Sequence, residues 1–162
     1  MLLYSAVAIY VAALIVANLL AAHYGPSITP WLAFTLVGLD LSVRDWLQVQ
    51  ISRRHMAMLI PAAGLLAYIL NPAVRQIAVA STVAFVVSEW AEWGTFTLTK
   101  GTWFSRSVKA NTVAAAVDSL LFPTLAFGGL LPVIVLAQFV AKCFGSSMWA
   151  YGLQFVPMQR RR

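Results

Sequence analysis

The sequence predicts an all-α, polytopic membrane protein, a bundle of six transmembrane helices with short loops. Three observations predict it. Of the 162 residues, 61% are hydrophobic and only 10% are charged, whereas soluble domains carry about 25% charge. The apolar residues gather in long runs separated by short segments that contain Gly or Pro. At about 20 residues per span, this length accommodates about six membrane crossings.

Residues that favour helix ends delimit the predicted helices. Gly25-Pro26 follows the first helix, and Gly128-Gly129 follows the fifth. Asn71-Pro72 closes the third helix, because a proline disfavours helical conformation at the preceding residue. Pro61 lies inside that third helix and is expected to kink it. The predicted helices cover residues 2–22, 31–51, 55–70, 73–99, 107–127 and 131–153.

Basic residues concentrate on one predicted side of the membrane. Eight of them lie on that side, against Arg75 alone on the other. Because positive charge favours the cytoplasmic side, we expect both termini in the cytoplasm. The expected location is the inner or plasma membrane, for a multi-pass protein that is bacterial or phage-encoded. Residues 1–162 then form a single transmembrane domain with a basic cytoplasmic tail at 154–162. The eight residues are Arg53, Arg54, Lys100, Arg106, Lys109, Arg160, Arg161 and Arg162.

Composition and motif content argue against other protein classes. The basic residues behind the net charge of +6 are scattered over short connections, so no nucleic-acid binding is expected. The single Cys143 excludes an internal disulfide framework and is interpreted as a packing residue. His23 and His55 lie at opposite ends of the membrane, so no metal or other cofactor is expected. The sequence carries no nucleophile-elbow or zinc-protease motif, which argues against an enzyme.

Seven ionisable residues lie inside the predicted helices. Each charge at the centre of a span costs about 2.5–3.5 kcal/mol, or roughly 20 kcal/mol for all seven if they faced lipid alone. They must therefore face one another, a cavity or a polar ligand. The default hypothesis is a solute pathway or binding site. The seven are Asp40, Arg44, Asp45, Glu89, Glu92, Asp118 and Lys142.

The spacing of these residues predicts polar faces on several helices. Asp40, Arg44 and Gln48 follow one another at intervals of four, so the second helix carries one polar stripe. Asn111 and Asp118 are seven apart and share a face of the fifth helix. The rise of 1.5 Å per residue places polar residues of different helices at similar depths. The candidate substrate-binding residues are Asp40, Arg44, Glu89, Glu92, Asn111, Asp118 and Lys142.

Ion pairing inside the membrane is the alternative interpretation of the same residues. Asp40 could pair with Arg44, and Asp118 with Lys142. Five acids face only two bases, however, so at least three carboxyl groups lack a basic partner in the spans. Asp45 is the weakest candidate, since it lies beside the stripe and is expected to face a neighbouring helix or subunit.

Carboxylates at fixed positions suit a ligand rich in N–H donors. A carboxylate can accept two parallel N–H bonds from the edge of a guanine-like ring. Trp90, Trp93 and Phe96 lie beside the two glutamates and could stack on a flat heterocycle, with lipid contact as the alternative. The residues alone indicate a polar solute that is planar or cationic.

Four segments in order resemble the queuosine-precursor transporter family, also described as vitamin-uptake-transporter-like. Residues 39–44 (Leu-Asp-Leu-Ser-Val-Arg) are similar to that family's Asp-Leu-x-Val-Arg segment. Residues 88–92 resemble its pair of polar residues three apart, and residues 110–119 its Ser-Asn-x6-Asp pattern. Lys142 stands where the family has a lysine in the last helix. The resemblance extends from Asn18 to Tyr151.

This resemblance implies import of 7-deazaguanine precursors of the tRNA nucleoside queuosine, chiefly 7-cyano-7-deazaguanine and its aminomethyl relative. It assigns the same seven candidate residues to the substrate pocket or its support. The chain departs from the family in its short loops, and some relatives carry Gln where Glu89 stands. Facilitated diffusion and proton coupling through Glu89 or Asp118 both remain open.

Other functions fit the same sequence features. A vitamin or purine binder that resembles an S-component would need an ATPase partner, because the chain has no ATP-binding motif. A structural or pore-forming membrane protein would not need the acidic residues. For the transporter, the expected partners are the substrate, the lipid bilayer and a second copy in a homodimer.

Overall fold

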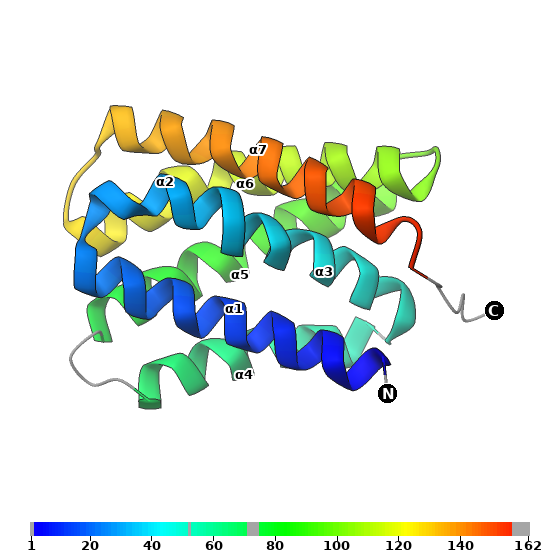
Figure 1. Ribbon diagram of the computed structural model, residues 1–162, viewed down its shortest axis with the longest axis horizontal. Coiled ribbons are helices and arrows are strands. Elements are labelled where there is room, and N and C mark those ends of the chain that lie inside the picture. Colours follow the sequence, from blue (N-terminus) through cyan, green and yellow to red (C-terminus); the bar gives the residue numbers. More distant parts are fainter. Residues whose placement is uncertain (1, 52, 71–74, 157–162) are drawn as a thin grey trace.

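The computed structural model describes residues 2–51, 53–70 and 75–156, and the regular structure in these ranges is helical. Long helices run side by side, roughly along the long axis of the molecule (Figure 1). A 3₁₀ turn, η1, and a π-helical turn, η2, connect with α2 and α3 into one continuous helical rod, Pro26–Gln50. This segment follows α1 and is called the second rod. The elements are α1 (Leu2–Tyr24), η1 (Pro26–Ile28), α2 (Thr29–Leu32), η2 (Ala33–Val37), α3 (Gly38–Gln50), α4 (Arg53–Leu70), α5 (Arg75–Leu98), α6 (Trp103–Phe127) and α7 (Pro132–Leu153).

Four helical segments of the described chain are long and apolar enough to cross a membrane. They are Leu3–Tyr24, Pro26–Gln50, Trp103–Phe127 and Pro132–Leu153. The expected count of six membrane-spanning helices is therefore not confirmed, because α4 and α5 are not among the four. Glu89 and Glu92 lower the mean hydropathy of α5, and α4 begins with two arginines and a histidine.

Helix boundaries follow local capping chemistry. The second predicted helix begins at Pro26 instead of residue 31, because proline is well accommodated in the first helical turn. The fifth begins at Trp103 instead of residue 107, where the Thr102 hydroxyl accepts a hydrogen bond from the Ser105 N–H at 3.2 Å. It ends at Phe127 and is followed by Gly128, whose φ of 74° is in the left-handed region that glycine adopts most easily.

Two sequence-based expectations fall outside the described residues. The Asn71-Pro72 end of the third predicted helix lies in the gap at 71–74. Most of the predicted basic tail, including its three arginines, lies in 157–162.

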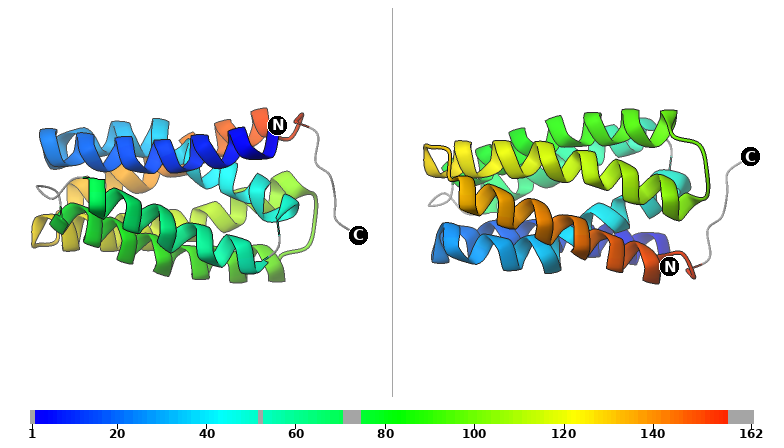
Figure 2. Two further views of the ribbon diagram at one scale, coloured as in Figure 1. Left: turned by 90° about the horizontal axis from the view of Figure 1, so that it is seen from below. Right: turned by 90° about the horizontal axis from the view of Figure 1, so that it is seen from above.

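Both ends of the described chain lie at one end of the bundle. The start of α1, the end of α3, the loop between α5 and α6, and the end of α7 gather there (Figures 1 and 2). The α5–α6 loop brings Lys100 to this end, and Arg106 lies in the first turn of α6. The Arg106 guanidinium donates two hydrogen bonds to the Phe96 carbonyl, at 3.1 and 2.7 Å, near the end of α5. A cation at this position also complements the negative end of the helix dipole.

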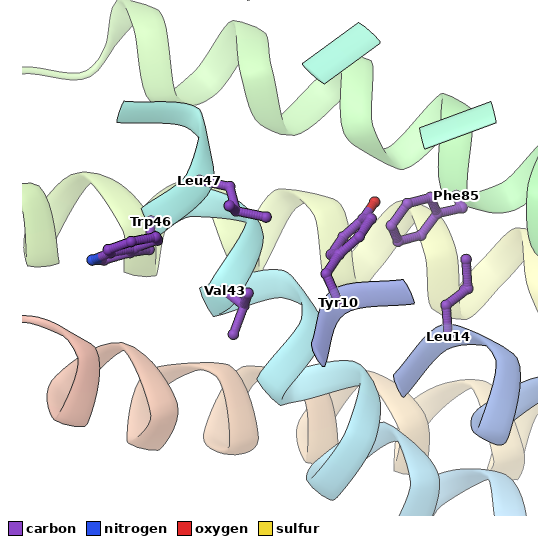
Figure 3. Close-up of a cluster of buried hydrophobic side chains, with 6 residues drawn as sticks. All are labelled: Tyr10, Leu14, Val43, Trp46, Leu47 and Phe85. Carbon is purple, nitrogen blue, oxygen red and sulfur yellow. The ribbon is translucent and has the colours of Figure 1, made fainter. Parts of the chain in front are cut away.

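Apolar side chains from α1, α3 and α5 form a buried hydrophobic cluster. The Tyr10 and Phe85 rings lie with centroids 6.1 Å apart. Packing of this kind holds helices together in a membrane, where lipid is as apolar as the core itself. Figure 3 shows the cluster, which consists of Tyr10, Leu14, Val43, Trp46, Leu47 and Phe85.

Two glycines allow the second rod to contact α7 closely. A Cβ atom on Gly145 would collide with the Phe34 carbonyl group, and one on Gly38 would lie 2.8 Å from the Gly145 carbonyl carbon. The Ser42 hydroxyl donates to the Ser146 carbonyl of α7 at 2.7 Å. Small residues at helix crossings are the usual means of such close approach in membranes. This contact holds α3 against α7. It therefore fixes the relative position of the polar side chains that both helices direct into the bundle.

Replacement of Gly145 by alanine should destabilise the bundle. The added methyl group must displace the Phe34 backbone, and overpacking of this kind costs about 1–3 kcal/mol in the free energy of unfolding. Thermal unfolding of the purified protein in detergent measures the effect. Gly152→Ala is the matched control on the same helix, because a Cβ there meets nothing within 4 Å. Equal stability of the two variants would contradict the close contact.

Candidate functional site

A pocket opens between α1, the second rod, α5, α6 and α7. Asp40, Asp118 and Lys142 of the seven predicted residues line it. Arg44, Glu89, Glu92 and Asn111 do not line it, so the structure divides the predicted site into two groups. The pocket is lined by Ala13, Leu14, Ala17, Asn18, Ala21, Thr29, Leu32, Ala33, Leu36, Val37, Asp40, Ser81, Phe85, Asp118, Phe122, Gln138 and Lys142.

Lys142 organises the α7 wall of the pocket. Its ammonium group lies 2.5 Å from Asp118 Oδ2, 3.1 Å from Ser119 Oγ and 3.0 Å from Gln138 Oε1. The three N–H donors of the lysine are thus all used. The Gln138 amide in turn donates to Thr29 Oγ1 at 2.8 Å. Asp118 and Lys142 form the ion pair that the sequence allowed, and this wall of the pocket is electrically balanced.

Asp40, on the wall formed by α3, differs from Lys142 because one of its oxygens has no partner. Its side chain lines the pocket and is only 3% exposed. Asp40 Oδ1 accepts no hydrogen bond from any described residue, and the alternative pairing with Arg44 is not formed. Asn18 Nδ2, across the pocket on α1, likewise has no acceptor within the described chain. Buried polar groups without partners are costly, so these two atoms mark a place for a polar ligand or water.

A separate network surrounds Arg44, whose side chain is fully buried. The guanidinium forms ion pairs with Glu89 and with Glu92, and its Nη2 lies 3.3 Å from Glu92 Oε2. Arg44 Nη2 also donates to Asn111 Oδ1 at 3.5 Å. This network joins α3, α5 and α6 beside the pocket. Asn111, Glu89 and Glu92 therefore contact Arg44 and do not line the cavity.

Asp45 is a full member of this network, although the sequence made it the weakest candidate. Its Oδ2 accepts hydrogen bonds from the Ser107 hydroxyl and from Asn111 Nδ2, the latter at 3.0 Å. The expectation that it faces a neighbouring helix is met by α6. Three carboxyl groups, on Asp45, Glu89 and Glu92, thus lie within 4 Å of one guanidinium.

The sequence analysis missed several residues of the pocket. Thr29 and Ser119 complete the hydrogen bonds around Gln138 and Lys142, but a hydroxyl in an apolar helix is too common to single out. Phe85 and Phe122 are the aromatic residues that line the cavity. Trp90, Trp93 and Phe96 were the expected stacking residues, but none of them lines the pocket. Trp90 and Trp93 are 78% and 45% exposed, and the buried Phe96 ring lies 4.1 Å from the Arg106 guanidinium.

Comparison with known proteins identifies the family. Residues 4–151 match the family described as Putative vitamin uptake transporter. The chain belongs to this vitamin uptake transporter family. Its apolar helices are those of a multi-pass membrane protein, as membership of a transporter family requires. No curated protein and no solved structure matches the chain.

The Arg44 network should be essential for the stability of this family member. Arg44→Gln leaves three buried carboxyl groups without their counter-charge, and loss of one partner of a buried ion pair costs about 3–5 kcal/mol. Thermal unfolding in detergent should show a clear fall in midpoint. Lys109→Gln, on the exposed face of α6, is the control and should change the free energy of unfolding by no more than about 0.5 kcal/mol. A normal midpoint for Arg44→Gln would refute the ion-pair network.

Proposed function

We propose that this protein imports 7-deazaguanine precursors of queuosine through the pocket between α1, the second rod and α7. Family membership supports transport of a vitamin-like solute. The single observation that carries the finer proposal is Asp40, a buried carboxylate that lines the pocket with a free Oδ1 atom. Such a group is suited to a neutral, flat ligand with adjacent N–H donors.

The chemistry of the pocket fits a deazaguanine ring. The ring N–H and exocyclic amine of its pyrimidine edge lie in parallel and can both bond to one carboxylate, here Asp40. The free Asn18 amide can donate to a carbonyl or nitrile group of the ligand. Phe85 and Phe122 supply apolar surface for the flat ring. The Asp118–Lys142 pair keeps the opposite wall neutral.

We also propose that α4 and α5 complete six membrane crossings with both termini in the cytoplasm. The two ends of the described chain lie at one end of the bundle, together with the loop that carries Lys100 (Figure 2). An even number of crossings accounts for that arrangement. The ion pairs from Arg44 to Glu89 and Glu92 offset the charges that lower the hydropathy of α5.

Uptake in a bacterium that lacks queuosine-precursor synthesis and its own importer tests the proposal. Cells that express this chain receive a low concentration of 7-cyano-7-deazaguanine, and queuosine in their tRNA is measured. Restored queuosine is the expected result. Protein that is present in the membrane without any queuosine in tRNA would overturn the substrate assignment. It would then direct the search to another flat solute or to an ATPase partner.

Replacement of Asp40 by asparagine should abolish high-affinity binding. The amide removes the charged acceptor, and hydrogen bonds to charged groups contribute about 1.5–3 kcal/mol, so affinity should fall roughly 10- to 100-fold. Binding of 7-cyano-7-deazaguanine to the purified protein, measured by calorimetry, checks the value. Thr112→Val is the control, because this exposed hydroxyl on α6 bonds to the Val108 carbonyl of its own helix and does not line the pocket. Equal affinity in the two variants would remove Asp40 from the site.

A further inference from the structure

The two unpaired polar side chains of the pocket lie at different depths along the bundle. Asn18 lies six residues before the end of α1, and Asp40 lies fourteen residues after the start of the second rod. Those two helix ends are joined by Gly25 and lie at one end of the bundle (Figure 1). At a rise of 1.5 Å per residue, Asn18 and Asp40 are about 12 Å apart along the bundle axis. Both line the pocket, so the cavity has two polar ends.

The end of the pocket remote from Asp40 contains a distal group of neutral polar residues, which consists of Asn18, Thr29, Ser81 and Gln138. Thr29 and Gln138 are occupied, because Gln138 donates to Thr29 Oγ1 at 2.8 Å and accepts from Lys142 at 3.0 Å. Asn18 differs from them. It is only 6% exposed, and its Nδ2 atom has no acceptor in the described part of the chain. A buried amide that is unpaired beside a cavity indicates a hydrogen bond that a ligand completes.

The distal end of the pocket offers a cation no counter-charge. Among the described residues that line the cavity, the carboxylates are Asp40, at the other end, and Asp118, which is held by Lys142. The distal group itself consists of two hydroxyl and two amide side chains, all uncharged. A ligand that binds Asp40 with one edge therefore places its opposite end against neutral groups. Burial of an ammonium group there, without an acidic partner, is costly.

We propose that Asn18 is the specificity-determining residue of the pocket, and that it selects a ligand whose far end carries a neutral hydrogen-bond acceptor over one whose far end carries an ammonium group. The proposal rests on the proposed function, in which the N–H edge of a deazaguanine binds Asp40. The opposite end of that molecule carries the substituent at position 7. A flat bicyclic ring with a short substituent, together with a hydrogen bond of about 2.9 Å at each end, spans the distance between the two residues.

The two precursors differ in this substituent. The nitrile nitrogen of 7-cyano-7-deazaguanine is a neutral acceptor, to which Asn18 Nδ2 can donate. The aminomethyl group is a primary amine, which is protonated at neutral pH as lysine is. A half-turn of the Asn18 amide would present its oxygen to that ammonium but would supply no counter-charge. Reversal of the ligand would bring the ammonium to Asp40, but the parallel donors of the ring edge would then face one amide oxygen instead of a carboxylate.

Calorimetry with both compounds on the purified protein tests the role of Asn18. Wild-type protein should bind 7-cyano-7-deazaguanine at least about tenfold more tightly than the aminomethyl compound, because an unpaired buried ammonium is penalised. Asn18→Asp supplies the missing counter-charge and should reverse the order of the two affinities. Asn18→Leu removes the donor and should weaken binding of the nitrile roughly 3- to 10-fold, the effect of one neutral hydrogen bond. This second variant decides the case if Asn18→Asp does not fold.

Thr124→Val is the control, because this hydroxyl bonds to the Leu120 carbonyl of its own helix at 2.7 Å and does not line the pocket. It should leave both affinities unchanged. A ratio of affinities that is the same in wild type and in the Asn18 variants, or a wild-type preference for the aminomethyl compound, overturns the role of Asn18 while the proposed function stands. Folded wild-type protein that binds neither compound would instead overturn the proposed function, and the role of Asn18 with it.

Discussion

The burial of Arg44 is the constraint on which the arrangement of this bundle depends. A guanidinium cannot lose its charge in a protein, so it must be matched wherever it is buried. Here the match comes from Glu89 and Glu92 of α5 and from Asn111 of α6. These contacts hold α5 and α6 against the rod that carries Asp40. The polar network therefore specifies which helices are neighbours, a choice that non-directional apolar packing alone does not specify.

Polar residues in this protein are used in two ways at neighbouring positions. The Asp118–Lys142 pair is closed, because every donor of the lysine has an acceptor. Asp40 is open, with one oxygen that no described residue satisfies. The fully hydrogen-bonded ion pair gives the pocket wall a defined shape and no net charge. The unpaired carboxylate can accept hydrogen bonds from a ligand. The pocket combines the two, so that the Asp40 carboxylate and the Asn18 amide are unsatisfied polar groups beside a balanced ion pair.

Much of the helical architecture could be predicted from the sequence, because Gly, Pro and long apolar runs determine helix ends directly. Which polar residues are buried could also be predicted, since a charge in an apolar helix has few alternatives. The partners of Arg44 and Asp45 could not be predicted. The spacing of Asp40 and Arg44 allowed a pair within one helix as the alternative interpretation, but the long arginine side chain reaches Glu89 on another helix. Asp45 was undervalued for the same reason, because its partners on α6 depend on how two helices are rotated against each other.

The π-helical turn at Ala33–Val37 has a consequence for how the polar stripe is aligned. A π turn holds one more residue than an α turn, so everything that follows is rotated by about 100° relative to an uninterrupted α-helix. Asp40 and Arg44 both follow it, whereas Thr29 and Leu32 precede it, and residues from both sides line the same cavity. The extra residue thus determines how the residues before the π turn are rotated relative to the residues after it. The number of residues in this one turn therefore determines which side chains line the pocket as much as the identity of any lining residue does.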